Sequence, residues 1–285
     1  MMTPSEYLLV GHITADLTPS GRRLGGTVSY AARVASAFGL PVKLLTSAQQ
    51  DEPLLNELQP YVAEMTVLPA AATSTFENIY QQGKRTQYIR GVAAPIMAAD
   101  VPAGWQSAPL VHLAPLTGEV DPQIVHAFAD SFVLLTAQGW FRQWGEDGRV
   151  RFKRWFDPDI VRALDVVVFS IEDIAEAPDL EALMADVAKC LIVTRGAEGG
   201  TYYYQGQVFH YDTLPLEEVD VTGAGDVFAA SLLSSLHFFN NDIHKAIQVA
   251  ARLAANSIMR VGLEGTPTPD EVRNALDTLR AGSSA

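Results

Sequence analysis

The sequence predicts an α/β fold whose central, mainly parallel β-sheet is covered by helices on both faces. Short apolar runs, such as residues 7–10 and 166–169, have the length of buried strands. The segments between them are rich in alanine or repeat apolar residues at helical spacing. Strands that alternate with helices pair in parallel through crossover connections, so both faces of the sheet become covered.

The predicted elements follow one another along the chain. We expect the first strand at residues 7–11 and an alanine-rich helix at 27–38, which ends at Gly39. Further buried strands are expected at residues 42–46, 110–113, 132–135, 166–169 and 191–194. The C-terminal third is helical, with one helix at 223–239, a second capped by Asp242 and a third beginning at Thr268-Pro269.

Two segments depart from this alternation. Residues 73–90 have the pattern of a β-hairpin with Gly83 in the turn and mixed polar and aromatic arms, which predicts an exposed flap. Residues 150–155 predict another short exposed strand. No internal repeat or inter-domain linker interrupts the sequence, so we expect a single domain over residues 1–285.

Composition and charge exclude several classes of function. The formal net charge of −13 argues against general nucleic-acid binding, which needs a basic surface. No apolar run is long enough to cross a bilayer and no secretory signal is recognisable, so we expect a cytoplasmic protein with no membrane partner. The single cysteine, Cys190, excludes an intramolecular disulfide and a thiolate zinc site.

The most informative segment is Asp220-Val221-Thr222-Gly223-Ala224-Gly225-Asp226, which leads into a predicted helix. Unpaired N–H groups at a helix start form an anion site together with the helix dipole, and glycines let a phosphate approach closely. A carboxylate at Asp226, in the first turn, is suited to orienting a hydroxyl that attacks the phosphate. A helix start with a glycine turn and an acid is also a common structural pattern, so the segment alone leaves a structural role open.

The segment from Asp220 to Phe228 resembles the C-terminal signature of the ribokinase-type (phosphofructokinase-B, PfkB) carbohydrate kinases. Gly25-Gly26 before the alanine-rich helix, Asp16 after the first strand, and the stretch from Thr194 to Gly199 resemble other segments of that family, in the same order. The resemblance implies a ribokinase-like three-layer fold with a small β lid, formed by residues of about 12–25 and 73–92.

The resemblance also implies roles for individual residues. Asp226 is expected to be the catalytic base, and the amides of Gly223, Ala224 and Gly225 are expected to form the anion hole. The residues expected to bind substrate are Asp16, Gly25, Gly26, Ser29, Glu77, Asn78, Gln138 and Arg142. Those expected on the nucleotide side are Thr194, Gly196, Gly199, Thr222, Gly223 and Gly225.

Two departures from the family pattern bear on substrate and metal. Thr27 and the residues after it stand where sugar kinases often carry lysine or asparagine, so ribose and fructose 6-phosphate fit poorly. The family's Asn-x-x-Glu is replaced by Ser170-Ile171-Glu172-Asp173. Glu172 and Asp173 are expected near a Mg²⁺ ion held through water, although an ordinary helix cap explains them equally well. Asp220 and Thr222 match positions that hold a monovalent cation such as K⁺ in several relatives.

These observations predict an ATP-dependent phosphotransferase that uses Mg²⁺ and moves the γ-phosphoryl group to a hydroxyl of a small polyol, sugar or nucleoside. The stretches around Gln138 and Arg142 and around Glu77 and Asn78 resemble a branch of the family that includes myo-inositol kinases, which implies an inositol-like or sugar acceptor. The alternative is a non-catalytic nucleotide- or sugar-binding regulatory protein on the same fold, favoured only by the altered segment at 170–173. A homodimer through the lid and a monomer both fit the sequence.

Overall fold

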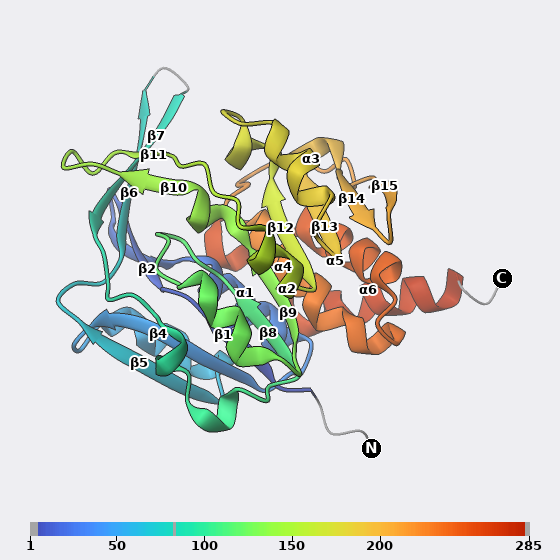
Figure 1. Ribbon diagram of the computed structural model, residues 1–285, viewed down its shortest axis with the longest axis horizontal. Coiled ribbons are helices and arrows are strands. Elements are labelled where there is room, and N and C mark those ends of the chain that lie inside the picture. The colour runs from blue at the N-terminus through green and yellow to red at the C-terminus, as the bar shows by residue number, and fades with distance from the viewer. Residues whose placement is uncertain (1–4, 82–83, 283–285) are drawn as a thin grey trace.

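The computed structural model describes residues 5–81 and 84–282, and its centre is a nine-stranded sheet of order β15-β14-β13-β12-β9-β8-β1-β4-β5 (Figure 1). The strands from β13 to β5 pair in parallel, while β14 and β15 add an antiparallel edge. Its strands are β1 (Tyr7–Val10), β4 (Val42–Gln49), β5 (Glu64–Ala70), β8 (Leu110–Leu113), β9 (Phe132–Thr136), β12 (Val166–Ser170), β13 (Cys190–Thr194), β14 (Gly200–Tyr204) and β15 (Gln207–Tyr211).

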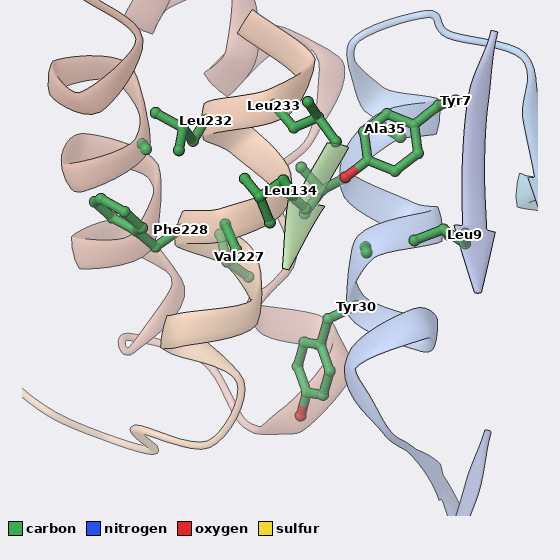
Figure 2. Packing of buried hydrophobic residues seen from close by; sticks show 14 of the residues in the cluster. Tyr7, Leu9, Tyr30, Ala35, Leu134, Val227, Phe228, Leu232 and Leu233 are labelled. Atoms are coloured by element: carbon green, nitrogen blue, oxygen red, sulfur yellow. The ribbon is translucent and has the colours of Figure 1, made fainter. Parts of the chain in front are cut away.

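Helices cover both faces of this sheet. Successive apolar side chains of a strand point to opposite faces, so each face has a hydrophobic core that helices must cover. In β1, Tyr7 and Leu9 belong to one core, whereas Leu8 and Val10 belong to the other. Figure 2 shows the first core, where Val227 and Leu233 lie on the side of their helix that faces Leu134 of the sheet. This core holds α1 (Thr27–Ala37), α4 (Ala224–Ser235), α5 (Ile243–Ser257) and α6 (Pro269–Gly282), and the other holds α2 (Pro158–Ala163) and α3 (Asp179–Ala185).

The predicted fold class is confirmed, with corrections at the edges of the sheet. The expected buried strands and the three C-terminal helices lie within a few residues of their predicted positions. Three strands of this nine-stranded sheet were not predicted, and all lie towards its edges, namely β5, β14 and β15. An edge strand carries polar residues and prolines that interrupt the apolar signal, as Glu64 and Pro69 do in β5. Among the described residues, no helix combines the length and apolar character needed to span a membrane.

A second, four-stranded sheet projects from the main one, at the upper left of Figure 1. Its order is β3-β2-β6-β7, and its strands are β2 (Thr14–Thr18), β3 (Gly21–Gly25), β6 (Thr75–Gln81) and β7 (Lys84–Gly91). The predicted hairpin is therefore present, although its expected turn residue, Gly83, lies outside the described residues. Both segments predicted to form a lid contribute strands to this sheet.

A short hairpin of β10 (Arg142–Trp144) and β11 (Val150–Phe152) lies along β7. The Ile89 N–H donates to the Gly148 carbonyl at 2.8 Å, and Tyr88 forms a β-bridge with Arg149. The predicted strand at 150–155 is therefore shorter than expected. The hairpin connects the small sheet to the segment that follows β9 in the main sheet.

A buried carboxylate holds the junction between the two sheets. Glu119 is 5% exposed and accepts hydrogen bonds from the backbone N–H groups of His12, Leu116 and Thr117, at 2.7 to 3.2 Å, and from the Thr117 hydroxyl at 3.0 Å. Burial raises the pKa of Glu119, but the nearby His12 and these hydrogen bonds outweigh burial and hold it below its ordinary value. Glu119 thus fixes the loop after β8 against the end of β1.

The fully buried His12 ties the same junction to the segments that flank β6 and β7. Its Nδ1 lies 2.7 Å from the Ser74 hydroxyl and its Nε2 lies 2.8 Å from the Ala94 carbonyl. On another side of the small sheet, Arg22 of β3 forms an ion pair with the buried Glu52 at 2.6 Å. These contacts fix where the small sheet stands on the main one.

We predict that Glu119→Gln lowers the free energy of unfolding by about 1–3 kcal/mol, because the new amide NH₂ meets backbone N–H groups that need an acceptor. Denaturant unfolding measures the change. Glu57→Gln, at an exposed position, is the matched control and should change the stability by less than about 0.5 kcal/mol. Equal effects of the two substitutions would contradict the junction role of Glu119.

Candidate active site

The site begins at the N-terminus of α4, which rests on the first turns of α1. Gly223 precedes α4 with φ +83°, a left-handed conformation that favours glycine. A Cβ at this position would lie 2.1 Å from Cε1 of Tyr30. Figure 2 shows the Tyr30 ring pointing towards the start of α4. Glycine is therefore needed at this position both for the turn and for the close approach of the two helices.

Asp226 lies in the first turn of α4 and is half-buried. The Thr27 hydroxyl, in the first residue of α1, donates a hydrogen bond to Asp226 Oδ1 at 2.7 Å. Burial raises the pKa of Asp226 to about 6, and the hydrogen bond from Thr27 opposes that shift. A carboxylate with such a pKa is closer to a useful proton acceptor at neutral pH than an ordinary aspartate is.

The charges of three other residues shift the pKa of Asp226, so these residues lie near its carboxylate. The charge of Arg142 lowers the pKa of Asp226, whereas the carboxylates of Asp173 and Asp16 raise it. These residues come from separate parts of the chain, and the sequence predicted a site role for each of them. The structure therefore brings four predicted polar residues to the start of α4.

Asp16 lies on β2, at the base of the small sheet. The Thr14 hydroxyl donates to Asp16 Oδ1 at 3.0 Å. A Cβ at Gly25 would lie 2.3 Å from Asp16 Oδ2, so the glycine leaves room for the carboxylate. Gly26, with φ +90°, follows it as the N-cap residue that precedes α1. The predicted glycine pair thus shapes the backbone between Asp16 and Thr27.

Gln138 lies in a short 3₁₀ helix at Ala137–Phe141, directly after β9, and Arg142 is the residue that follows this helix. The Arg142 guanidinium lies over the Phe76 ring, with Cζ 5.6 Å from the ring centre, and its Nη1 donates to the Leu116 carbonyl at 3.2 Å. Arg142 therefore joins the small sheet to the loop that Glu119 holds. Gln138 Nε2 donates to Asp173 Oδ1 at 2.9 Å.

Asp173 also has a structural role. Its Oδ2 accepts the Ser170 N–H at 2.9 Å, which forms the capping arrangement that the sequence left open. Glu172 is exposed. Within residues 5–81 and 84–282, no group of three or more His, Cys, Asp or Glu side chains could hold a metal ion. The magnesium roles of Glu172 and Asp173 remain predictions.

The two polar residues predicted on β6 point to opposite faces of the small sheet, because side chains alternate along a strand. Asn78 shares a face with the buried Phe76, and its Oδ1 accepts from Gln87 Nε2 at 3.2 Å. Glu77 faces the other way and pairs with Arg90 at 2.6 Å. Glu77 therefore does not lie on the face of the small sheet where Phe76 contacts Arg142.

Ser29 is also turned away from the site. It is fully buried, and its hydroxyl donates to the Gly25 carbonyl at 2.7 Å. Residues two apart on a helix point in nearly opposite directions, so Ser29 cannot lie on the side where Thr27 contacts Asp226. Its role in this structure is to hold the glycine turn.

The segment predicted on the nucleotide side follows β13. Thr194 ends that strand, Gly196 stands in open space, and Gly199, with φ +77°, packs against the Tyr211 carbonyl. The Tyr211 ring stacks on Phe228 of α4, with ring centres 5.3 Å apart. Tyr211 therefore links this segment to the helix that carries Asp226.

A cavity of about 410 Å³ opens beside this link. Its walls come from β14, β15, the residues after β15, α5 and the end of α6, and include Tyr211, Asp212, Gln248, Ala251 and Arg252. Its volume and aromatic wall suit a flat, partly polar group.

The loop before α4 is tied to the loop before α6. Asp220 Oδ1 accepts the Thr222 N–H at 2.9 Å, and Asp220 Oδ2 accepts the Gly262 N–H at 2.9 Å. Asp220 thus connects two backbone segments close to the start of α4, while Thr222 is exposed. Their predicted roles in holding a monovalent cation remain predictions.

Comparisons with known proteins agree with this geometry. Residues 162–270, which include the start of α4, match the family model of pfkB family carbohydrate kinases. The resemblance to the pfkB carbohydrate kinases is therefore found again over this segment, which carries Asp226 and its glycines. The predicted family and the predicted enzyme class, a kinase with an alcohol acceptor, are therefore confirmed.

Individual relatives are similar over most of this chain. An inositol 3-kinase from Zea mays is 29% identical, over 81% of this chain and 66% of that relative. A fructokinase from Escherichia coli is 27% identical, over 88% of this chain and 86% of that relative. A pyrophosphate-dependent kinase in the ribokinase family, complexed with a pyrophosphate analogue and myo-inositol, has a TM-score of 0.79 at 21% identity, over 94% of this chain and 99% of that one.

Sequence reasoning missed three residues that shape the site. Thr27 contacts Asp226, Tyr30 packs on Gly223, and Glu119 fixes the loop that receives Arg142. The positions of Thr27 and Tyr30 directly after the Gly25-Gly26 pair were the available signal. Nothing in the pattern around Glu119 distinguishes it from an exposed acid.

We predict opposite effects on stability for two glycines of the α4 turn. Gly223→Ala should destabilise the fold by about 2 kcal/mol or more, because its Cβ meets Tyr30 and φ is positive. Gly225→Ala should be neutral or stabilising by up to about 1 kcal/mol, because its Cβ meets open space in a helix.

Activity should separate from stability in Gly225→Ala, because the added methyl occupies the space through which a phosphate approaches the helix start. We expect a loss of turnover of about 10²-fold, the order that follows from a small displacement of reacting groups. Urea unfolding and turnover measured on the same preparation test both glycines. Wild-type turnover in Gly225→Ala would rule out phosphate binding at this helix start.

Proposed function

We propose that this protein transfers the γ-phosphoryl group of ATP to a hydroxyl of a small, uncharged polyol or sugar, with Asp226 as the catalytic base. The observation that carries the proposal is the position of Asp226, whose carboxylate lies beside a glycine-rich helix N-terminus and has its pKa raised to about 6. A phosphate bound by the helix start and a hydroxyl bound by Asp226 would be neighbours.

The charges around Asp226 favour an uncharged acceptor. Asp16, Asp173 and Asp226 supply three carboxylates, and Arg142 is the cation that acts on Asp226. An acceptor that already carries a phosphate would meet net repulsion here. Hydroxyl groups, in contrast, can donate to carboxylates and accept from arginine. The named activities of the maize and Escherichia coli relatives, on inositol and fructose, agree with this class of acceptor.

The chemical step moves one proton and one phosphoryl group. The acceptor oxygen forms a bond to the γ-phosphorus as the bond from that phosphorus to the bridging oxygen of ADP breaks. The acceptor proton passes to Asp226, which accepts it late, because an alcohol becomes acidic only as the new bond forms. The backbone N–H groups of Gly223 and Gly225 would stabilise the charge on the phosphoryl oxygens, whereas the Ala224 N–H donates to the Val221 carbonyl at 3.2 Å in this structure.

The small sheet would serve as a lid over the acceptor. It carries Asp16, Phe76 and Asn78 on the face that meets Arg142. Excluding water from this space would suppress hydrolysis of the donor and would strengthen the interactions of the charged groups. Pairing of two such lids in a homodimer stays a prediction.

ATP is the proposed donor because the cavity beside Tyr211 offers a place for its base. The cavity adjoins the segment that ends at Gly199 and lies along the helix that follows α4. The alternative donor is pyrophosphate, which has no base and would not need this cavity. It is considered because one structural neighbour is a pyrophosphate-dependent kinase. The donor is therefore a point for direct measurement.

Magnesium is the proposed partner of the donor. Mg²⁺ prefers oxygen ligands and keeps several waters, so it suits a site in which the donor phosphates supply most ligands and Asp173 supplies a carboxylate. When bound, the ion neutralises charge on the phosphates. Asp173 would hold this position through its hydrogen bonds with Gln138 and Ser170.

We predict that Asp226→Asn lowers turnover by about 10³-fold or more while ATP affinity stays within a few-fold, because the change removes the proton acceptor and keeps its size. In the wild type, kcat/KM should fall about tenfold per pH unit below about pH 6, as Asp226 becomes protonated. Initial rates across pH 5–9 measure both effects. Retained turnover in the variant would remove Asp226 from the mechanism.

A coupled ADP-release assay tests the proposed activity itself. The panel contains myo-inositol, fructose, ribose, fructose 6-phosphate and nucleosides, with Asp226→Asn as the control. We expect turnover on an uncharged polyol or sugar and little on fructose 6-phosphate. ATP binding without turnover on any acceptor would instead favour the binding-protein alternative, which the replacement of the Asn-x-x-Glu segment at 170–173 supports.

The donor is tested by filling the cavity. Gln248→Trp should raise the KM for ATP about tenfold or more, the effect of losing about 1.4 kcal/mol of binding, and should leave the acceptor KM unchanged. Arg273→Trp, at an exposed position of α6 outside the cavity wall, is the matched control. An unchanged KM for ATP, or turnover with pyrophosphate that exceeds turnover with ATP, would overturn the donor assignment.

A further inference from the structure

Asp226 needs more than a raised pKa to act as a base, because a carboxylate has two oxygens and rotates about its side-chain bonds. A hydrogen bond to one oxygen fixes the group and leaves the other to face the reacting hydroxyl. In the described structure, the hydrogen bond to the Asp226 side chain comes from the Thr27 hydroxyl, at 2.7 Å on Oδ1.

Thr27 is well placed to fix the carboxylate. It is 2% exposed and is the first residue of α1, so packing and helix geometry both restrict its side chain. It lies 199 residues from Asp226 in sequence, and α1 and α4 pack directly against each other. Tyr30, one turn along the same helix, contacts the α4 turn at Gly223. The start of α1 therefore forms a rigid support for the start of α4.

We propose that Thr27 is a positioning residue for the transfer reaction: its hydroxyl holds Oδ1 of Asp226, so that Oδ2 is the oxygen that receives the acceptor proton. This inference rests on the proposed function of Asp226. It assigns Thr27 a role in orientation and protonation rather than in substrate contact, since its single hydroxyl proton is used on Oδ1.

The hydrogen bond also favours the charged form of Asp226, because a hydroxyl donates more strongly to a carboxylate than to a neutral acid. Burial and the carboxylates of Asp173 and Asp16 push the pKa of Asp226 upwards, while Thr27 and Arg142 oppose them. Tyr30 faces the same region and remains neutral at working pH, because burial raises its pKa above the ordinary value. Removal of the Thr27 hydroxyl should therefore shift the pKa of Asp226 further upwards.

The test is Thr27→Val, which keeps the branched shape and removes the donor. We expect kcat to fall about 10- to 100-fold at pH 7, the range for losing a hydrogen bond to a charged group. The acid limb of the pH–rate profile should move to higher pH, and the acceptor KM should change little. Thr27→Ser, which restores the hydroxyl, should recover most of kcat and return the limb towards its original position.

Two further variants separate this role from general effects of packing. Ser231→Ala also removes a buried hydroxyl from the α1 and α4 layer, one with no hydrogen-bond partner in the described structure, and should leave kcat and the pH profile unchanged. Thr27→Ala removes the donor without adding an apolar methyl beside the carboxylate, and it replaces Thr27→Val if that variant does not fold. Thermal unfolding confirms that each variant is folded.

Each outcome decides a different claim. An unchanged pH profile and kcat in Thr27→Val, with an inactive Asp226→Asn, would overturn the role of Thr27 and keep the proposed function. A loss of kcat that Thr27→Ser does not recover would show that the side chain acts through packing, which also overturns the inference. Retained turnover in Asp226→Asn would instead remove the proposed base itself.

Discussion

The first turns of α1 and α4 pack against each other, and the remaining site groups are arranged around that contact. Gly223 lets the α4 turn approach the Tyr30 ring, and the Thr27 hydroxyl reaches Asp226 across the same interface. The contact brings together a helix N-terminus that suits a phosphate and a carboxylate that suits a hydroxyl proton. A side chain at position 223 would push the two helices apart. It would thereby disturb the arrangement of the phosphate site and of Asp226 relative to α1.

The small sheet is held relative to this centre by buried polar groups. Glu119 satisfies backbone N–H groups of the loop whose Leu116 carbonyl receives Arg142, and His12 ties the same junction to Ser74 and Ala94. The Arg142 guanidinium in turn lies over the ring of Phe76, a residue of the small sheet. Arg142, which is expected to bind the acceptor, therefore also contacts the small sheet and the loop that positions it. Binding of the acceptor at Arg142 would thus be coupled to the position of the lid.

The sequence predicted the chemistry better than it predicted the orientation of individual side chains. Asp226 and its glycines were recognised because they are local in sequence and lie at a helix start. Thr27 was missed as a partner because its contact joins residues 199 positions apart. Ser29 and Glu77 were predicted at the site but point elsewhere. Residue type alone does not specify which side of a helix, or which face of a small sheet, is turned towards the site. The edge strand β5 was missed for a different reason, because Glu64 and Pro69 interrupt its apolar pattern.

The central claim is that a phosphoryl group passes to an acceptor hydroxyl bound at Asp226. The most direct measurement follows the ³¹P NMR spectrum of Mg-ATP with the protein, in the presence and absence of myo-inositol or fructose. The account predicts a phosphomonoester signal that appears only with the acceptor, at the rate at which ATP disappears. Release of inorganic phosphate at the same rate with and without an acceptor would contradict the account, because it would mean that water occupies the position assigned to the acceptor.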